Sequence, residues 1–225
     1  MKLSHSFTRA VTLRLRKLLT VGGFAFLVLF IVGCDSTKMS DERAETAAVS
    51  LRITDLPADP FVGFVEGRPV GTGRYTFFSL GESEVVSSAD SATTRWDIAF
   101  QGTNILINGG TSGPGLGAAQ VLDGIFEEIL EAPITDWSVD GEIGPAILPG
   151  SGNGWYNYNP VAQVITPIPG RILLIKTAGA KYAKIRIVSY YQGAPETPTA
   201  ESTARYLTFD FVLQPNGGRS FELDP

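Results

Sequence analysis

The chain has 225 residues, of which 44% are hydrophobic, 18 are basic and 23 are acidic. All of the acidic residues lie beyond residue 33, and no basic cluster follows that point. Proteins that bind nucleic acid neutralise its phosphates with clustered Lys and Arg side chains, so this acidic chain is not expected to bind nucleic acid. The single cysteine excludes a disulfide framework.

The N-terminal residues predict an export signal. Basic side chains stand at positions 2, 9, 14, 16 and 17, and an almost wholly apolar run follows at residues 18–32. A charged start and an apolar middle are typical of a signal peptide. The run is shorter than the roughly 20 residues that a membrane-spanning helix needs. We therefore expect residues 1–33 to be a signal peptide rather than a permanent anchor.

The signal ends on a candidate lipidation site. The sequence I-V-G-C at residues 31–34 resembles the lipobox of bacterial lipoproteins, in which a small residue precedes the cysteine. This resemblance implies cleavage before Cys34 and acylation of Cys34 with chains such as palmitate, each buried methylene contributing about 0.8 kcal/mol of membrane affinity. Residues 34–50 are polar and lack periodicity, which predicts a flexible tether. We expect an exported protein, anchored by its lipid to the outer membrane or the cell surface.

Residues 51–225 predict one domain, built mostly of strands, that is long enough to bury a full core. Strand patterns occur at residues 75–80, 84–86, 164–176, 182–191 and 205–213. In the last two, polar and apolar residues alternate, which is typical of half-exposed antiparallel strands. The link at residues 193–202 contains two prolines and predicts an exposed hairpin loop between these strands.

The segment at residues 95–119 joins two strand patterns to a glycine-rich stretch. Trp96, Ile98 and Phe100 alternate with smaller or polar residues, which predicts a strand with one buried face. A turn and a second strand at residues 105–107 follow. We expect Trp96 to lie in the core.

The glycine-rich stretch itself, residues 108–115, superficially resembles a phosphate-binding loop. It lacks the Lys-Ser/Thr ending of such a loop, so we interpret it as a structural turn. We expect the carboxylate of Asp97 to accept hydrogen bonds from the backbone of this stretch.

Residues 119–131 leave two interpretations open. Apolar residues between Val121 and Leu130 recur at helical spacing opposite acidic ones, and Pro133 would end the helix. Gly124 weakens a helix by about 1 kcal/mol relative to alanine. A short helix is slightly favoured over an extended or irregular segment.

The W-D-I-A-F sequence at residues 96–100, followed by N-G-G-T-S-G at residues 108–113, resembles the signature of the HmuY family. These are haem-binding lipoproteins on the surface of Bacteroidetes-type bacteria. The resemblance extends from about Tyr75 to the C-terminus. It implies an all-β, mostly antiparallel, two-sheet sandwich-like domain with a haem crevice near its edge. It also implies haem or another apolar small molecule as ligand, and an outer-membrane transporter or a haemoprotein as partner.

The iron ligands of the family are missing from the predicted domain. Best-known members hold haem iron between two histidines, and some relatives use methionine. The only histidine here is His5, in the predicted signal peptide, and Met39 lies in the predicted tether. A two-histidine haem site is therefore excluded, and no metal ligand is assigned.

Aromatic residues stand where the resemblance places a family ligand, at residues 154–160. Tyrosine can bind ferric iron as a phenolate, so ligation by Tyr156 or Tyr158 stays open, provided that a positive neighbour or the metal keeps the oxygen ionised. We favour Trp155, Tyr156 and Tyr158 as residues whose rings cover the sheet and stack on a flat apolar ligand without bonding its metal.

No catalytic set is recognisable in the predicted domain. It has no histidine or free cysteine for nucleophilic catalysis. Four carboxylates could do acid–base chemistry, but a solvated acidic face explains them better; they are Glu127, Glu128, Asp136 and Asp140. We therefore predict a non-enzymatic surface lipoprotein that captures a tetrapyrrole or another apolar ligand. The alternative is an envelope structural or protein-interaction lipoprotein that has lost haem binding.

Overall fold

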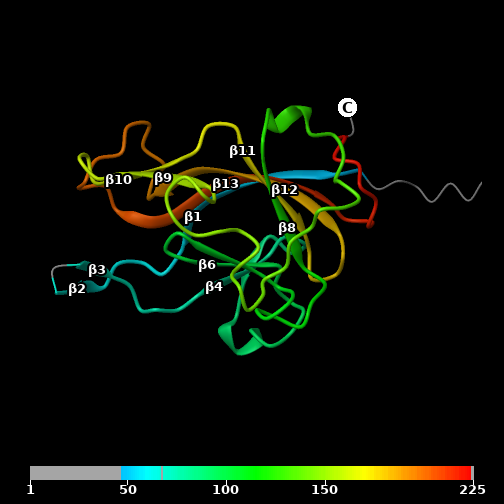
Figure 1. The fold of residues 1–225 in the computed structure, drawn as a ribbon, viewed down its shortest axis with the longest axis horizontal. Helices are drawn as coiled ribbons and strands as arrows, with labels where there is room; N and C mark the ends of the chain where they lie inside the picture. The colour runs from blue at the N-terminus through cyan, green and yellow to red at the C-terminus, as the bar shows by residue number, and fades with distance from the viewer. Residues whose placement is uncertain (1–46, 67, 224–225) are drawn as a thin grey trace, which may run out of the picture. The chain divides into compact units, whose positions relative to one another are not determined.

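A computed structural model describes residues 47–66 and 68–223, which form thirteen β-strands and two 3-10 helices, η1 (Ser88–Asp90) and η2 (Phe126–Glu128) (Figure 1). Every strand pairing among these residues is antiparallel. This part of the chain has no helix with the length and apolarity needed to cross a membrane.

The larger sheet contains five strands in the spatial order β1-β13-β12-β11-β8. Their bounds are Val49–Pro57 for β1, Ala204–Gln214 for β13, Tyr182–Tyr191 for β12, Arg171–Lys176 for β11 and Ala118–Asp123 for β8. The predicted loop at residues 193–202 is the mostly exposed hairpin that joins β12 to β13. The first strand begins at Val49, slightly before the predicted start of the domain.

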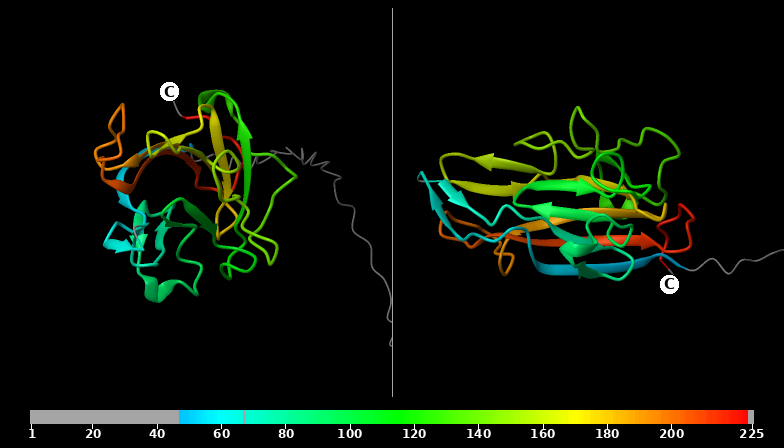
Figure 2. Two further views of the ribbon diagram at one scale, coloured as in Figure 1. Left: turned by 60° about the vertical axis from the view of Figure 1, so that its left-hand side comes forward. Right: turned by 90° about the horizontal axis from the view of Figure 1, so that it is seen from below.

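The smaller sheet contains four strands in the order β5-β4-β6-β7. Their bounds are Glu84–Val86 for β5, Thr76–Ser79 for β4, Ile98–Gln101 for β6 and Asn104–Ile107 for β7. Figure 2 shows the five-stranded sheet curving over this smaller one. Phe78 and Phe100 pack against Phe209 of the larger sheet, with ring centroids 5.8 and 5.7 Å apart. Because the facing sheets bury their apolar sides together, the predicted all-β, two-sheet, sandwich-like fold is confirmed.

Trp96 is fully buried, as predicted, but it does not share a face with Ile98 and Phe100. It packs with Ala99 in a separate cluster on the other side of the four-stranded sheet. The single buried face predicted from Trp96 to Phe100 is therefore wrong, because β6 begins only at Ile98 and both of its faces are covered.

Two ribbons of two strands each complete the described strands. They are β2 (Gly63–Val65) with β3 (Arg68–Val70), and β9 (Tyr156–Asn159) with β10 (Val164–Pro167). The strand predicted at residues 164–176 is thus two strands, β10 and β11. The chain turns at residues 168–170 and passes from the second ribbon into the five-stranded sheet.

Residues 119–131 are a strand followed by one turn of 3-10 helix. β8 pairs with β11 as the edge of the larger sheet, and η2 follows it after a bend at Gly124. The favoured helix is therefore wrong for the first half of this segment. Pairing with β11 satisfies the backbone of β8, which outweighs the helical spacing of its side chains.

The second half of the segment covers the outer face of the five-stranded sheet. Phe126 packs there together with Phe221 and Val212. Beneath them Lys184 is only 3% exposed, and its Nζ donates to the carbonyl oxygens of Phe126 and Ile129 at 2.6 and 2.8 Å. Burial lowers the pKa of this amine. The prediction that β12 and β13 expose one face is wrong at these positions, because a distant segment covers it.

The glycine-rich stretch is a structural turn, as predicted. A Cβ atom built on Gly109 would lie 2.1 Å from the carbonyl oxygen of Gly117, so only glycine fits. The side chain of Asn108 holds the turn, since its Oδ1 accepts a 3.0 Å hydrogen bond from the backbone nitrogen of Gly115.

Two acidic side chains differ from their predicted roles. Among the described residues the carboxylate of Asp97 does not bond the glycine-rich backbone; it accepts hydrogen bonds from the backbone nitrogens of Leu80 and Ala178 at 2.8 and 2.9 Å. Asp140 does not belong to a solvated face, because it is 2% exposed and accepts a 2.9 Å hydrogen bond from the backbone nitrogen of Ile107. The other three carboxylates of the predicted acidic face are exposed.

Candidate functional site

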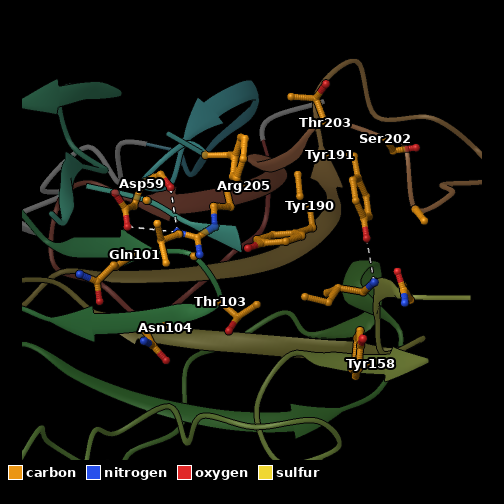
Figure 3. Close-up of a pocket in the computed structure, with 18 of the residues that line it drawn as sticks. Asp59, Gln101, Thr103, Asn104, Tyr158, Tyr190, Tyr191, Ser202, Thr203 and Arg205 are labelled. Carbon is orange, nitrogen blue, oxygen red and sulfur yellow. Dashed lines mark hydrogen bonds and ion pairs between the residues drawn. The ribbon is translucent and has the colours of Figure 1, made fainter. Parts of the chain in front are cut away.

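A groove of about 1180 Å³ opens between the β2–β3 ribbon, the β6–β7 turn, the β9–β10 ribbon and the β12–β13 hairpin. We call it the edge groove. Figure 3 labels ten of the residues that line it, which come from segments far apart in the sequence. Concave sites of roughly 300–1,000 Å³ are typical of small-molecule binding, so this groove has room for a large organic ligand.

Exposed aromatic rings lie on the walls of the edge groove. Phe61 and Phe64 are 46% and 70% exposed and contact each other edge to face, with ring centroids 5.1 Å apart. Tyr158 of β9 is 46% exposed and also lines the groove. Large apolar rings that are exposed beside a concavity mark a surface suited to a flat apolar ligand.

A charged pair lies at the base of the edge groove. Arg205 donates through Nη1 to the carbonyl oxygen of Asp59 at 3.0 Å and to its carboxylate Oδ2 at 3.1 Å. The carboxylate also accepts hydrogen bonds from Thr72 and Gly73. Burial works to raise the pKa of Asp59, but these hydrogen bonds and the Arg205 charge outweigh it and hold the pKa below its usual value. The Asp59 carboxylate therefore stays ionised and holds the Arg205 guanidinium in place.

Two adjacent tyrosines at the end of β12 differ in their hydrogen bonding. The hydroxyl of Tyr191 accepts a 2.8 Å hydrogen bond from the backbone nitrogen of Ile165, which ties the β9–β10 ribbon to the larger sheet. The hydroxyl of Tyr190 has no hydrogen-bond partner among the described residues, and it points towards Arg205 in Figure 3. Burial raises the pKa of both phenols, and the Arg205 charge partly opposes the rise at Tyr190.

The three residues predicted to bind ligand lie in different surroundings. Trp155 is 2% exposed, and its indole nitrogen donates a 2.9 Å hydrogen bond to the carbonyl oxygen of Thr103. Tyr156 is half-buried, and its hydroxyl accepts a 3.4 Å hydrogen bond from the Thr103 hydroxyl. Of the three, only Tyr158 lines the edge groove. Trp155 instead packs behind Tyr190, with ring centroids 5.9 Å apart.

Sequence reasoning missed Asp59, Tyr190 and Arg205. Tyr190 belongs to a recognisable doublet at the end of a strand, but nothing local shows which of its two rings reaches a groove. Asp59 belongs to no strand pattern or motif that we recognised in the sequence, and its partner, Arg205, lies more than a hundred positions away. Residues 47–66 and 68–223 hold no cluster of three or more His, Cys, Asp or Glu side chains that could bind a metal ion.

Comparison with known proteins gives one family match. The family described as HmuY protein matches residues 72–211. A putative HmuY-like heme binding protein from Bacteroides vulgatus is 15% identical, with a TM-score of 0.43 and coverage of 75% of this chain and 92% of that chain. No curated protein matches the chain.

Two further solved structures are similar at the same level. A putative lipoprotein from Bacteroides fragilis is 15% identical, with a TM-score of 0.44 and coverage of 76% of this chain and 90% of that chain. The apo HmuY analog of Tannerella forsythia is 16% identical, with a TM-score of 0.41 and coverage of 75% of this chain and 96% of that chain.

Proposed function

Because this chain belongs to the HmuY family, we propose that it is a non-enzymatic lipoprotein that captures haem or a related tetrapyrrole in the edge groove. The observation that carries this proposal is the combination of exposed rings on the groove walls with a fixed charged pair at its base. Apolar walls with a few oriented polar groups are the usual composition of a small-molecule site.

The groove can accommodate a tetrapyrrole, but the atoms that it offers to the iron are oxygens rather than imidazole nitrogen or thioether sulfur. Residues 42–225 contain no histidine, methionine or cysteine. Flat rings such as Phe64 and Tyr158 can pack on a porphyrin face, and phenolic oxygens are the available iron ligands. When bound, the ferric iron would supply a Lewis acid that takes an oxygen donor. The protein itself would bind and orient the ligand and shield it from water.

The anchor and domain limits are part of the same proposal. Residues 1–33 would be removed as a signal peptide, Cys34 would carry the lipid, and the tether would run to about residue 50. These positions lie outside the described residues, except for the end of the tether. The polar spacer would place the edge groove away from the membrane, where a transporter or a haemoprotein could exchange the ligand.

The test is a titration of the unit Glu42–Pro225, a compact body with its own core. Haemin and metal-free protoporphyrin IX would be added separately while absorbance and tryptophan fluorescence are followed. We expect at least one of them to bind saturably at one equivalent, because the edge groove is a single site. An unsaturable, salt-sensitive change with both would contradict the proposal and favour the alternative, an interaction lipoprotein without a ligand.

A further inference from the structure

The hydroxyl of Tyr190 reaches the surface of the edge groove. Tyr190 is 5% exposed, and no buried side-chain oxygen or nitrogen of the described residues lacks a hydrogen-bond partner, so this hydroxyl is accessible from the groove. The hydroxyl of its neighbour Tyr191 has a hydrogen-bond partner, the backbone nitrogen of Ile165. No described residue bonds the oxygen of Tyr190, which instead faces the groove (Figure 3). An accessible hydroxyl that has no protein partner and is directed into a groove can bond to a ligand.

A glycine of the β6–β7 turn lies beside this oxygen. Gly102 has a φ of +56°, which favours glycine. A Cβ atom built there would lie 3.6 Å from the Tyr190 oxygen and 3.9 Å from the guanidinium carbon of Arg205. A Cβ at these distances would touch both groups, so glycine is the residue that covers them least.

Hydrogen bonds hold the guanidinium of Arg205 beside the Tyr190 oxygen. Arg205 is held through two oxygen atoms of Asp59, and Thr72 and Gly73 fix that carboxylate in turn. Without a ligand, Tyr190 stays a neutral phenol, because burial raises its pKa more than Arg205 lowers it. A ferric centre would shift this balance, since metal and guanidinium both stabilise the phenolate.

We propose that Tyr190 is the iron ligand of this protein, with Arg205 as the positioning residue that stabilises its phenolate. This inference rests on the proposed function. In the binding step the O–H bond of Tyr190 breaks, the proton passes to solvent and the oxygen forms a bond to the ferric iron of the tetrapyrrole. No electron is transferred.

The other groove tyrosines are less suited to this role. The hydroxyl of Tyr191 is already bonded, and Tyr158 is 46% exposed. The phenol of Tyr158 therefore lacks a water-excluded setting. Because an anionic oxygen ligand stabilises ferric iron more than ferrous iron, we expect the groove to prefer oxidised haem and to release it on reduction.

The experiment compares iron-containing and iron-free ligand on matched variants. Wild type is expected to bind haemin at least about tenfold more tightly than metal-free protoporphyrin IX, and to give a phenolate-to-iron charge-transfer band. Tyr190→Phe should lose this preference and the band while keeping its protoporphyrin affinity. Tyr182→Phe, at a tyrosine of β12 that does not line the edge groove, is the control and should keep both, and Tyr158→Phe tests the exposed phenol of the groove. Reduction with dithionite should weaken the haemin complexes of the wild type and of the control, but not that of Tyr190→Phe.

The outcomes separate the inference from the proposed function. If wild type binds both ligands equally, there is no iron bond; Tyr190 is then not a ligand, although the groove still captures a porphyrin. If Tyr158→Phe rather than Tyr190→Phe abolishes the preference, the assignment is overturned in favour of Tyr158. If neither ligand binds, both proposals fall. A native circular dichroism spectrum and retained protoporphyrin binding show that a variant is folded, and their loss identifies a variant that has failed to fold.

Discussion

Single buried polar residues hold the loops of this protein to its sheets. Asp97 joins the end of β4 to the turn after β11, through the backbone nitrogens of Leu80 and Ala178. Asn108 and Asp140 do the same for the glycine-rich turn and for the loop before Ile147. A buried N–H group without an acceptor is costly. Each of these side chains therefore stabilises a loop by accepting hydrogen bonds from backbone N–H groups that have no partner in a neighbouring strand.

Asp97→Ala should lower the free energy of unfolding by about 2 kcal/mol or more, because two buried backbone donors lose their acceptor. Burial raises the pKa of Asp97 and offsets part of what these bonds contribute, so the loss is smaller than the two bonds alone suggest. Urea denaturation of Glu42–Pro225 measures the change. Glu82→Ala, an exposed carboxylate in the nearby turn, is the control. Equal midpoints for the two variants would remove this role from Asp97.

At the scale of the elements, three strands are linked by charge on the outer face of the larger sheet. Arg52 of β1, Asp210 of β13 and Arg186 of β12 stand in register across the sheet. Both arginines donate to the Asp210 carboxylate, at 2.5 and 2.9 Å. The hydrogen bond from Arg52, then that from Arg186, hold the pKa of Asp210 below its usual value.

The lowered pKa of Asp210 determines how the stability of the protein changes with pH. A carboxyl whose pKa is lowered by folding stabilises the protein above its unfolded pKa of about 3.9, and this contribution is lost as the pH falls through the folded pKa. Asp210→Asn should therefore cost roughly 1–2 kcal/mol at pH 7 and progressively less below pH 4. Unfolding free energies of both proteins measured from pH 7 to pH 3 test this. A cost that stays constant over this range would contradict it; Glu84→Gln, an exposed change, should cost nothing at any pH.

The β2–β3 ribbon supplies an exposed wall of the edge groove, so its rings can be tested without disturbing the core. Phe64→Ala should weaken protoporphyrin binding about tenfold, because it removes apolar contact area worth 1–2 kcal/mol. The melting temperature should not change, since Phe64 is 70% exposed. Ile134→Ala, at an exposed apolar residue that does not line the groove, should alter neither quantity. Unchanged affinity in Phe64→Ala would remove the ribbon from the site.

At the scale of the whole molecule, the protein combines a candidate lipid anchor with a sandwich whose groove lies among its loops and ribbons. Loops and sheet edges vary more freely than the core, so a family can keep its fold while its ligand donors change. Residues 42–225 contain no histidine or methionine, so the donors of the proposed site are phenols.

Cys34→Ala should abolish attachment of labelled palmitate and move the protein from the membrane fraction to the soluble fraction, because the acyl chains provide the membrane affinity. The expressed full chain is the material, and Ser36→Ala is the control that keeps the cysteine. Label on the Cys34→Ala protein, or none on the wild type, would exclude this residue as the anchor.

Local sequence was sufficient for the features whose cause is local. The alternation at residues 182–191 and 205–213 and the prolines between them predicted β12, β13 and their hairpin, because period two reflects the pleat of the strand itself. The same reasoning failed for residues 119–131. There β11 provides pairing partners for β8, and no property of the segment alone indicates that they exist.

Residue types and their order were enough to predict an all-β domain, a cysteine suited to acylation, and phenols as the available donors. The positions of these groups in space could be read only from the folded protein. It buries Trp155 behind the ring of Tyr190 and brings Arg205 against Asp59. The reason is physical: residue type sets what a side chain can bond, whereas exposure and partners depend on contacts between segments far apart in the chain.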